Sequence, residues 1–424
     1  MTFPRILRPL SVLAMLLLGA GGPASAAAAS TAPSAWTVGT PIVTYWCGPA
    51  LSETVVAQMA EGGWNVLWCG PNDLDLLARH RLRGQLTDPL LSPATLDDAA
   101  QREKLDALIA RVRNHPALYA YYLRDEPNAK DFPALGRLVA YLRERDPAHL
   151  AYINLFPTYA TNEQLGNKGD VVTAYREHLR QYIDLVRPAL ISYDHYQFST
   201  RGDNDQYFLN LALIRQASLD AGLPFLNIVQ ACTWTPSMRV PTPDEMRYLV
   251  HTTLAYGAQG ISYYVYQCAN HTGGIAGADG SPTGLYEALR TLNREFAAIA
   301  AQLQPLRSLG VYHAGMAPRG TEPLPEKAAF RLDPPISAIA YQPPERVRGV
   351  VIGLFGTTAT RKAAEPTHAM VVNLDYAASR DVGIRGPGAL EIFDPLGAQW
   401  MPVRGRRAEV RLPQGGGCLL RVKP

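Results

Sequence analysis

Hydrophobic residues recur in two alternating spacings from about residue 39 to residue 306. Short apolar runs bounded by turn residues predict strands. Each run is followed by a longer segment whose apolar residues repeat every three or four positions, which predicts an amphipathic helix. The predicted strands are Ile42–Trp46, Asn65–Cys69, Leu82–Thr87, Ala117–Pro127, Ala151–Phe156, Ala189–Tyr193, Pro224–Gln230 and Gly260–Gln267.

The helices predicted between these strands carry recognisable start signals. Ser52 stands where it can cap the first of them, and Thr242 precedes a proline and two acids that suit the positive end of a helix dipole. The predicted helices are Ser52–Ala60, Asn72–Arg79, Thr95–Arg113, Phe132–Glu144, Val171–Val186, Asp205–Ala221, Pro243–Tyr256 and Leu285–Leu303.

Eight strand–helix pairs in this span match a (β/α)8 barrel, whose usual size is about 250 residues. We therefore predict a (β/α)8 TIM barrel over residues 39–306. An open, doubly wound sheet is the alternative. No Gly-x-Gly-x-x-Gly turn follows the first strand to favour that alternative.

The composition changes after about residue 306. Proline and glycine become frequent, helical spacing disappears, and short β-rich runs recur between turn residues. This pattern predicts a small C-terminal antiparallel β-sandwich over residues 307–424. Its predicted strands are Val350–Phe355, Ala369–Leu374, Leu390–Phe393, Ala408–Leu412 and Cys418–Val422.

The N-terminal residues have the pattern of a secretory signal peptide. Arg5 and Arg8 precede the apolar run Pro9–Ala20, and small residues then lead to Ala24-Ser25-Ala26. A retained membrane anchor is the alternative, but the apolar run is shorter than the roughly 20 residues that span a bilayer. We predict a signal peptide over residues 1–26, a linker over residues 27–38, and a secreted or periplasmic protein without a membrane span.

Charge excludes one class of partner. The chain has 40 basic and 37 acidic residues, and removing Arg5 and Arg8 with the leader leaves 38 against 37, a net charge of +1. Such a balance gives no electrostatic case for a nucleic-acid partner. Oligomeric state remains open.

The cysteines are candidates for disulfides in an exported protein. Cys47 and Cys69 follow the first two predicted strands, whereas Cys232 and Cys268 follow the seventh and eighth. Neighbouring strands lie about 4.8 Å apart, which is compatible with a Cys47–Cys69 or a Cys232–Cys268 bridge. A four-thiolate metal site is a less favoured alternative, and Cys418 would remain unpaired.

The predicted fourth strand ends in Asp125-Glu126-Pro127, and Pro127 cannot continue a central strand. Catalytic groups of a (β/α)8 barrel collect at the carboxyl ends of its strands. Cleavage of a glycoside needs one carboxyl that stays protonated near neutral pH, and Glu126 is the candidate donor. Strand alternation suggests that only one of Asp125 and Glu126 points inward. The alternative is an ordinary strand end whose acids are held by Arg124.

A fourth strand that ends in Asp-Glu-Pro resembles that of the clan A glycoside hydrolases, which usually end this strand in Asn-Glu-Pro. The resemblance covers about residues 42–306, and the C-terminal sandwich resembles that of β-galactosidase-like members. It implies that Glu126 is the acid/base and that Asp125 replaces an Asn that contacts the sugar. The family's nucleophilic Glu ends the seventh strand, where this chain has Gln230. We therefore interpret the chain as a divergent branch.

The second carboxylate must then come from elsewhere. Asp194, at the end of the sixth strand, is the preferred candidate, with Asp73 and Asp88 behind it. Asp194 could instead cap the next segment as a surface acid. A variant borrowed from retaining α-glycosidases has Asp125 attack and Asp194 donate. With no acid on strand seven, we favour inversion over retention.

Other residues near strand ends are candidates for sugar binding. Aromatic rings can cover the apolar face of a sugar, and amides can bond its hydroxyls. In clan A barrels a His and a Tyr at the sixth strand support the substrate, which implies that role for His195 and Tyr196. Packing is the alternative for each residue. The candidates are His195, Tyr196, Asn154, Asn227, Gln230, Gln267, Trp46, Trp68, Tyr159, Phe198, Trp234 and Tyr266.

These features predict a secreted glycoside hydrolase that cleaves a β-linked glycoside or oligosaccharide, with Glu126, Asp194 and Asp125 as catalytic candidates. No metal or cofactor is expected. The alternative is a carbohydrate-binding barrel without catalysis, which Gln230 favours.

The signal peptide generates the first testable prediction. Exported protein should begin at Ala27, because signal peptidase cleaves after a small-x-small sequence such as Ala24-Ser25-Ala26. N-terminal sequencing of material purified from the culture medium or periplasm measures this. An intact Met1 on exported material would contradict it.

Overall fold

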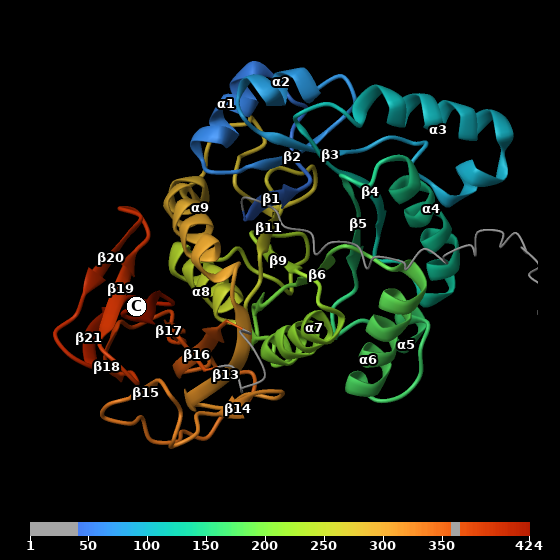
Figure 1. Ribbon diagram of the computed structural model, residues 1–424. Coiled ribbons are helices and arrows are strands. Elements are labelled where there is room, and N and C mark those ends of the chain that lie inside the picture. The colour runs from blue at the N-terminus through green and yellow to red at the C-terminus, as the bar shows by residue number, and fades with distance from the viewer. Residues whose placement is uncertain (1–40, 358–364) are drawn as a thin grey trace, which may run out of the picture. The chain divides into compact units, whose positions relative to one another are not determined.

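The computed structural model describes residues 41–357 and 365–424. The predicted signal peptide and linker lie outside the described residues. Eight parallel strands form one sheet in the order β1-β11-β9-β6-β5-β4-β3-β2, with helices outside it (Figure 1). The strands are β1 (Ile42–Trp46), β2 (Val66–Cys69), β3 (Arg83–Leu86), β4 (Leu118–Asp125), β5 (Leu150–Leu155), β6 (Ile191–His195), β9 (Phe225–Gln230) and β11 (Gly260–Tyr264).

Asn65 completes the circle between β1 and β2. Its backbone N–H donates to the Val43 carbonyl at 3.0 Å, and its side-chain oxygen accepts from the Val43 N–H at 2.8 Å. The side-chain amide also donates to the Pro41 carbonyl. One residue thus satisfies backbone groups at the seam. This nearly closed parallel arrangement confirms the predicted (β/α)8 barrel and disfavours the open, doubly wound sheet.

Local signals place the helices where the sequence predicts them. Ser52 accepts a hydrogen bond from the Val55 N–H, and Thr242 and Glu245 form a reciprocal capping box. Among the α-helices of residues 41–357 and 365–424, only the short α5 was not predicted. The helices are α1 (Glu53–Glu61), α2 (Leu74–Arg79), α3 (Ala99–Val112), α4 (Phe132–Arg145), α5 (Asn162–Leu165), α6 (Val171–Gln181), α7 (Tyr207–Ala221), α8 (Pro243–Ala255) and α9 (Gly284–Leu303).

A separate apolar cluster fills the barrel interior. It is built from strand residues and their approaches rather than from helices: Ile42, Val66, Tyr119, Ala120, Leu150, Tyr152, Leu190, Leu226 and Ile228. Side chains two positions apart share a face of a strand. The next inward positions therefore reach the carboxyl ends of the strands, where the candidate residues lie.

The C-terminal region contains two sheets. One has the order β14-β13-β16-β17-β22-β19-β20 and the other β15-β18-β21, and residues of both enclose one apolar cluster. This arrangement matches the predicted sandwich, although β13 and β14 pair in parallel. The strands are β13 (Arg307–Gly315), β14 (Glu322–Pro323), β15 (Arg331–Leu332), β16 (Gly349–Gly356), β17 (His368–Asn373), β18 (Arg380–Arg385), β19 (Leu390–Asp394), β20 (Gln399–Pro402), β21 (Arg407–Leu412) and β22 (Gly417–Val422).

The C-terminal sheet packs closely on a barrel helix. Strands β16 and β17 contact α8. A Cβ added at Gly353 of β16 would lie 2.0 Å from the Ala255 carbonyl oxygen, so only glycine permits this approach. Tyr256 and His313 add a buried hydrogen bond of 3.1 Å between the two regions.

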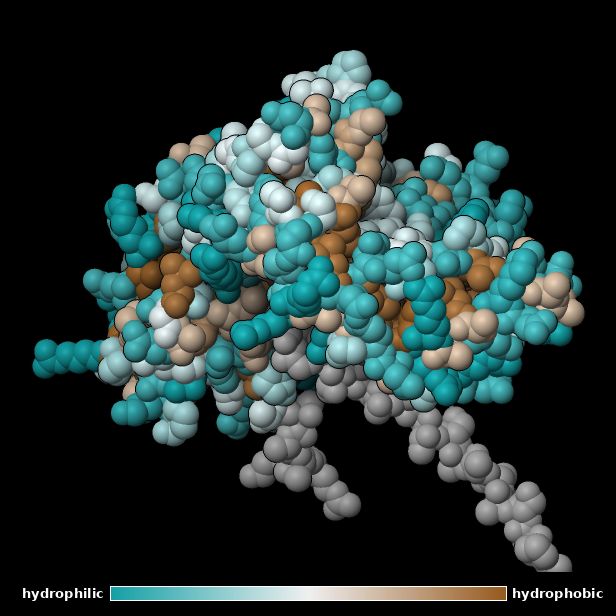
Figure 2. Space-filling model, turned by 90° about the horizontal axis from the view of Figure 1, so that it is seen from above, coloured by the Kyte–Doolittle hydropathy of each residue, from teal (hydrophilic) through white to brown (hydrophobic). Residues whose placement is uncertain are grey.

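On the face shown in Figure 2, hydrophilic residues surround several separate hydrophobic areas. Among the described residues the large exposed hydrophobic side chains are Tyr159, Leu185, Leu396 and Met401. Within residues 41–357 and 365–424, no helix is long and apolar enough to cross a bilayer.

The predicted Cys47–Cys69 and Cys232–Cys268 bridges are wrong for this structure, in which all five cysteines are free. The Cys69 side chain packs outward, where its sulfur lies 2.4 Å from a Cβ built on Gly84 of β3. Cys47 has a left-handed φ of 48°, and its thiol instead hydrogen-bonds to that of Cys268. Cys232 lies near this pair.

This contact predicts a different disulfide. Two electrons and two protons removed from Cys47 and Cys268 by oxidised glutathione should join these residues, because their thiols interact directly. Peptide mapping without reduction should recover a Cys47–Cys268 link, which Cys69→Ser keeps and Cys268→Ser abolishes. Recovery of a Cys47–Cys69 peptide from folded protein would contradict this pairing.

Candidate active site

Asn154 of β5 joins two acids at the carboxyl ends of neighbouring strands. Its amide nitrogen donates to Asp125 Oδ1 at 3.1 Å and to Asp194 Oδ1 at 2.9 Å. Its oxygen accepts from Ser192 Oγ at 3.1 Å, which fixes the direction of the amide. The register places Asp125 opposite Asn154 and Asn154 opposite Ser192, so the three strands bring this network together.

Two backbone irregularities aim the paired acids at one place. The β4–β5 register shifts between Tyr122 and Arg124, so β4 carries a bulge just before Asp125. Glu126 then adopts a φ of 41°, in the left-handed region that side chains rarely occupy. Simple alternation therefore ends at Asp125. The expectation that only one of the two acids points inward is wrong, because both join the same cluster.

Glu126 and Asp194 are hydrogen-bonded to each other through their carboxyl groups. Asp194 is only 2% exposed, whereas Glu126 is half-buried and Asp125 is exposed. The three acids thus run from the open mouth into the barrel. Two carboxyl groups in contact need a proton between them.

Burial is the main electrostatic effect in the cluster. It raises the pKa of Glu126 to about 7; the Asp125 charge adds to this rise, and the Asp194 hydrogen bond offsets part of it. Burial and the Glu126 charge raise the pKa of Asp194 well above its usual range. Asp125 reaches the surface, but desolvation by the groups around it still raises its pKa, against the Asn154 hydrogen bond and the Arg124 charge. Glu126 is therefore suited to hold a proton near neutral pH.

Half-buried aromatic rings flank the acids in two groups. Trp46, Trp68 and Tyr122 lie together at the ends of β1, β2 and β4, with ring centroids 4.6 to 5.9 Å apart. The second group lies around β6 and β11, where Trp234 is 4.8 Å from Tyr196 and 4.9 Å from Tyr264. Both groups present apolar surface of the kind that sugars stack on.

Gln230 faces the barrel interior, but its amide is fully occupied. Its oxygen accepts from the Phe198 N–H at 2.8 Å. Its nitrogen donates to the carbonyls of Phe198, Cys232 and Arg239. Gln230 therefore holds the loops after β6 and β9 in place, and no free group remains to contact a sugar.

His195 is buried beneath the site rather than open to it. Its Nδ1 lies 3.0 Å from Asn210 Oδ1, and burial lowers the pKa of the imidazole to about 4. The ring packs edge-on against Tyr159, whose hydroxyl accepts from the Tyr196 N–H at 3.3 Å. His195 is thus neutral near pH 7 and positions the two tyrosines.

Other sequence candidates lie outside the cluster. Phe198 and Tyr266 are core residues with 0% and 1% exposure, and Asn227 bonds Thr253 of α8 at 2.9 Å. Gln267 donates to the Ala278 carbonyl in a loop. Asp73 accepts from the Gly70 N–H, and Asp88 from the Leu90 N–H. The last two acids stabilise local turns.

Sequence reasoning missed Tyr122 and His271. Tyr122 lies two positions after the interior residue Ala120, before the β4 bulge, and packs against the same interior cluster. His271 lies 3.1 Å from the Tyr264 hydroxyl because β12 (Thr272–Gly273) pairs with β10 (Cys232–Thr233). A glycine-rich loop gives no signal of that pairing.

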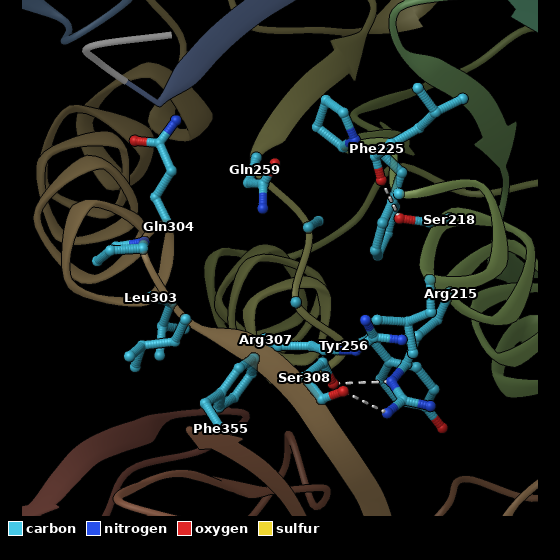
Figure 3. Close-up of a pocket in the computed structure, with 18 of the residues that line it drawn as sticks. Arg215, Ser218, Phe225, Tyr256, Gln259, Leu303, Gln304, Arg307, Ser308 and Phe355 are labelled. Carbon is cyan, nitrogen blue, oxygen red and sulfur yellow. Dashed lines mark hydrogen bonds between the residues drawn. The ribbon is translucent and has the colours of Figure 1, made fainter. Parts of the chain in front are cut away.

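A cavity of about 650 Å³ lies elsewhere, beside the amino ends of β9 and β11 (Figure 3). Figure 3 shows Arg215 reaching Ser308, to which it donates at 2.8 Å. None of its lining residues is Asp or Glu. Because acid catalysis needs a carboxyl or similar group, the carboxylate cluster and not this cavity is the candidate active site.

No metal centre emerges in the described part of the chain. Neither the cysteines nor the acids there form a group of three or more that is arranged to hold a metal ion.

Comparison with other proteins adds little. No protein-family model and no curated protein matches the sequence. A solved β-galactosidase from Rahnella sp. R3 has 10% identity and a TM-score of 0.46, over 91% of this chain and 99% of that one. A β-L-arabinopyranosidase from Geobacillus stearothermophilus has 10% identity and a TM-score of 0.45, over 91% and 97%. A β-galactosidase from Marinomonas ef1 has 10% identity and a TM-score of 0.44, over 62% and 60%. The fold assignment therefore rests on the strand order of this chain.

Proposed function

We propose that this protein is a secreted or periplasmic glycoside hydrolase that cleaves a β-linked glycoside or oligosaccharide. Glu126 is the general acid that protonates the leaving oxygen. The observation that carries the proposal is the cluster of Asp125, Glu126 and Asp194, in which burial raises the pKa of Glu126 to about 7. A donor with that pKa combines availability of the proton with ease of transfer at neutral pH.

Asp194 supports Glu126 rather than facing it across the sugar. Retaining and inverting pairs need carboxyl separations of about 5–5.5 Å and 6.5–9.5 Å, to leave room for the anomeric carbon or for water. Glu126 and Asp194 instead share a hydrogen bond. The bond raises the pKa of Asp194 and lowers that of Glu126, so Asp194 donates it and holds Glu126 in place. Asp125 is the acid that remains exposed to substrate.

A carbohydrate-binding barrel without catalysis is the second candidate. Gln230 favours this candidate, because β9 ends in an amide that is occupied by backbone groups and has no carboxylate to act on a sugar. Sugar binding without turnover in the wild-type protein would support this candidate.

Replacement of the acid gives a direct test. Glu126→Gln keeps the side-chain shape and removes the proton, so kcat on an alkyl or sugar leaving group should fall by about 10²–10⁴-fold. A 2,4-dinitrophenyl leaving group needs little protonation, so kcat on a substrate that carries it should fall much less. Steady-state kinetics on both substrates, with sugar affinity by calorimetry, measures the difference.

The matched control is Asp73→Asn, which changes another strand-end acid that serves only a local turn. Its activity should remain near that of the wild type. Equal activity of Glu126→Gln and wild type on an unactivated glycoside would remove Glu126 from the mechanism.

The pH profile gives a second test. Because the Glu126 pKa is raised to about 7, the protonated donor is present below that pH and kcat/KM should fall as pH rises through it. Asp125→Asn removes a negative neighbour that raises this pKa, so the alkaline limb should move to lower pH. A limb that stays in place or moves upward would contradict the coupling.

A further inference from the structure

The described acids of the site all lie on one side of it. Asp194 is bonded to Glu126, and Asn154 joins Asp125 to Asp194. All belong to the adjacent strands β4, β5 and β6. Displacement at an anomeric carbon needs a nucleophile on the face opposite the leaving group. A donor and a nucleophile within one hydrogen-bonded cluster cannot take opposite faces of a sugar ring.

The facing strands offer no replacement in the described part of the chain. β1 ends in Trp46, β9 in Gln230 and β11 in Tyr264. The Trp46 indole is not a nucleophile, burial raises the pKa of the Tyr264 phenol and keeps it protonated, and the Gln230 amide is fully occupied. The nucleophile must therefore arrive with the substrate or as water.

We infer that the substrate supplies it: the protein hydrolyses 1,2-trans glycosides of 2-acetamido sugars, in which the acetamide oxygen attacks the anomeric carbon and Asp125 accepts the acetamide N–H. This inference rests on the proposed function and adds the substrate class. Some glycosidases replace an enzyme nucleophile by such a substrate group.

The reaction balances with the groups present. The acetamide oxygen bonds to the anomeric carbon as the glycosidic bond breaks, and the leaving oxygen takes the bonding pair and the Glu126 proton. The nitrogen gains positive charge in the resulting bicyclic oxazolinium ion, which the Asp125 carboxylate stabilises. Water then attacks the same carbon, gives a proton to Glu126 and restores the acetamide. The product keeps its anomeric configuration.

Asp125 has the position that this role needs. It is exposed at the mouth, and it precedes the donor directly in the chain. Its carboxylate accepts from Asn154 at 3.1 Å and from the Glu126 N–H, and the lone pairs that remain on its exposed side can accept a further N–H. An acetamide group adjoins the anomeric carbon, so its acceptor must lie beside the acid rather than across the ring.

The aromatic group of Trp46, Trp68 and Tyr122 offers an apolar surface on which the methyl of the acetamide can pack. Tyr122 precedes Asp125 on β4, and the Asp125 charge acts on its hydroxyl. Its ring lies 4.6 Å from that of Trp68 and 5.9 Å from that of Trp46. A methyl group buries apolar surface against more than one ring where such rings meet.

The experiment compares 4-nitrophenyl 2-acetamido-2-deoxy-β-D-glucoside and -galactoside with the matching 2-hydroxy glycosides. Because an intramolecular nucleophile has a high effective concentration, kcat/KM for one acetamido substrate should be on the order of 100-fold higher or more. Replacing its acetyl by trifluoroacetyl makes the amide oxygen a weaker nucleophile and should slow turnover by roughly tenfold or more. A sugar-fused thiazoline, which mimics the bicyclic ion, should inhibit competitively.

Asp125→Asn should lower kcat on the acetamido substrate by about 10²-fold, because a neutral amide stabilises the cationic nitrogen poorly. Asp88→Asn, at a local turn, is the matched control and should retain activity. Faster hydrolysis of the 2-hydroxy glycosides, without thiazoline inhibition, would overturn this inference and leave the proposed hydrolase standing. Neither turnover nor sugar binding with any glycoside would overturn both.

Discussion

Three carboxyl groups share one small region of this barrel, and neither Glu126 nor Asp194 has a cationic partner among the described residues. Burial disfavours their ionised forms, so the cluster can persist only if protons and neutral donors replace the missing charge. Asn154 supplies the neutral donor and the Glu126–Asp194 hydrogen bond supplies the proton. The backbone strain at Glu126 is held by the same network.

The scaffold makes this arrangement rigid. Parallel pairing of β4, β5 and β6 sets the register of the three strand ends, and closure at Asn65 fixes the remaining strands around them. The N-cap at Ser52 and the capping box at Thr242 start two of the outer helices. Polar chemistry is thus concentrated at one end of an apolar barrel, as the geometry of parallel strands requires.

The barrel was predictable because its signals are local. Periodicity and caps depend only on neighbouring residues, and β1 begins and ends where the sequence predicts. The nine-residue β13 was missed because Gly310 and a bulge interrupt its alternation. The sandwich strands with regular apolar runs, such as β16, were found.

The sequence predicts which residues form the site better than it predicts the contacts between them. Glu126, Asp125, Asp194 and Asn154 all follow from their positions at strand ends. Their contacts depend on the β4 bulge and on the left-handed Glu126, which leave no mark on the sequence pattern. The cysteine pairing failed for a similar reason, because the left-handed turn at Cys47 sends its thiol toward Cys268.

The occupied amide of Gln230 limits how this site can change by evolution. A glutamate there would keep the length but lose both N–H groups, and its charge would face the carbonyl oxygens of Phe198, Cys232 and Arg239. Such repulsion would displace the loops that the amide now holds. A single substitution therefore cannot convert this barrel to one with its own strand-seven nucleophile, and that route passes first through rebuilt loops.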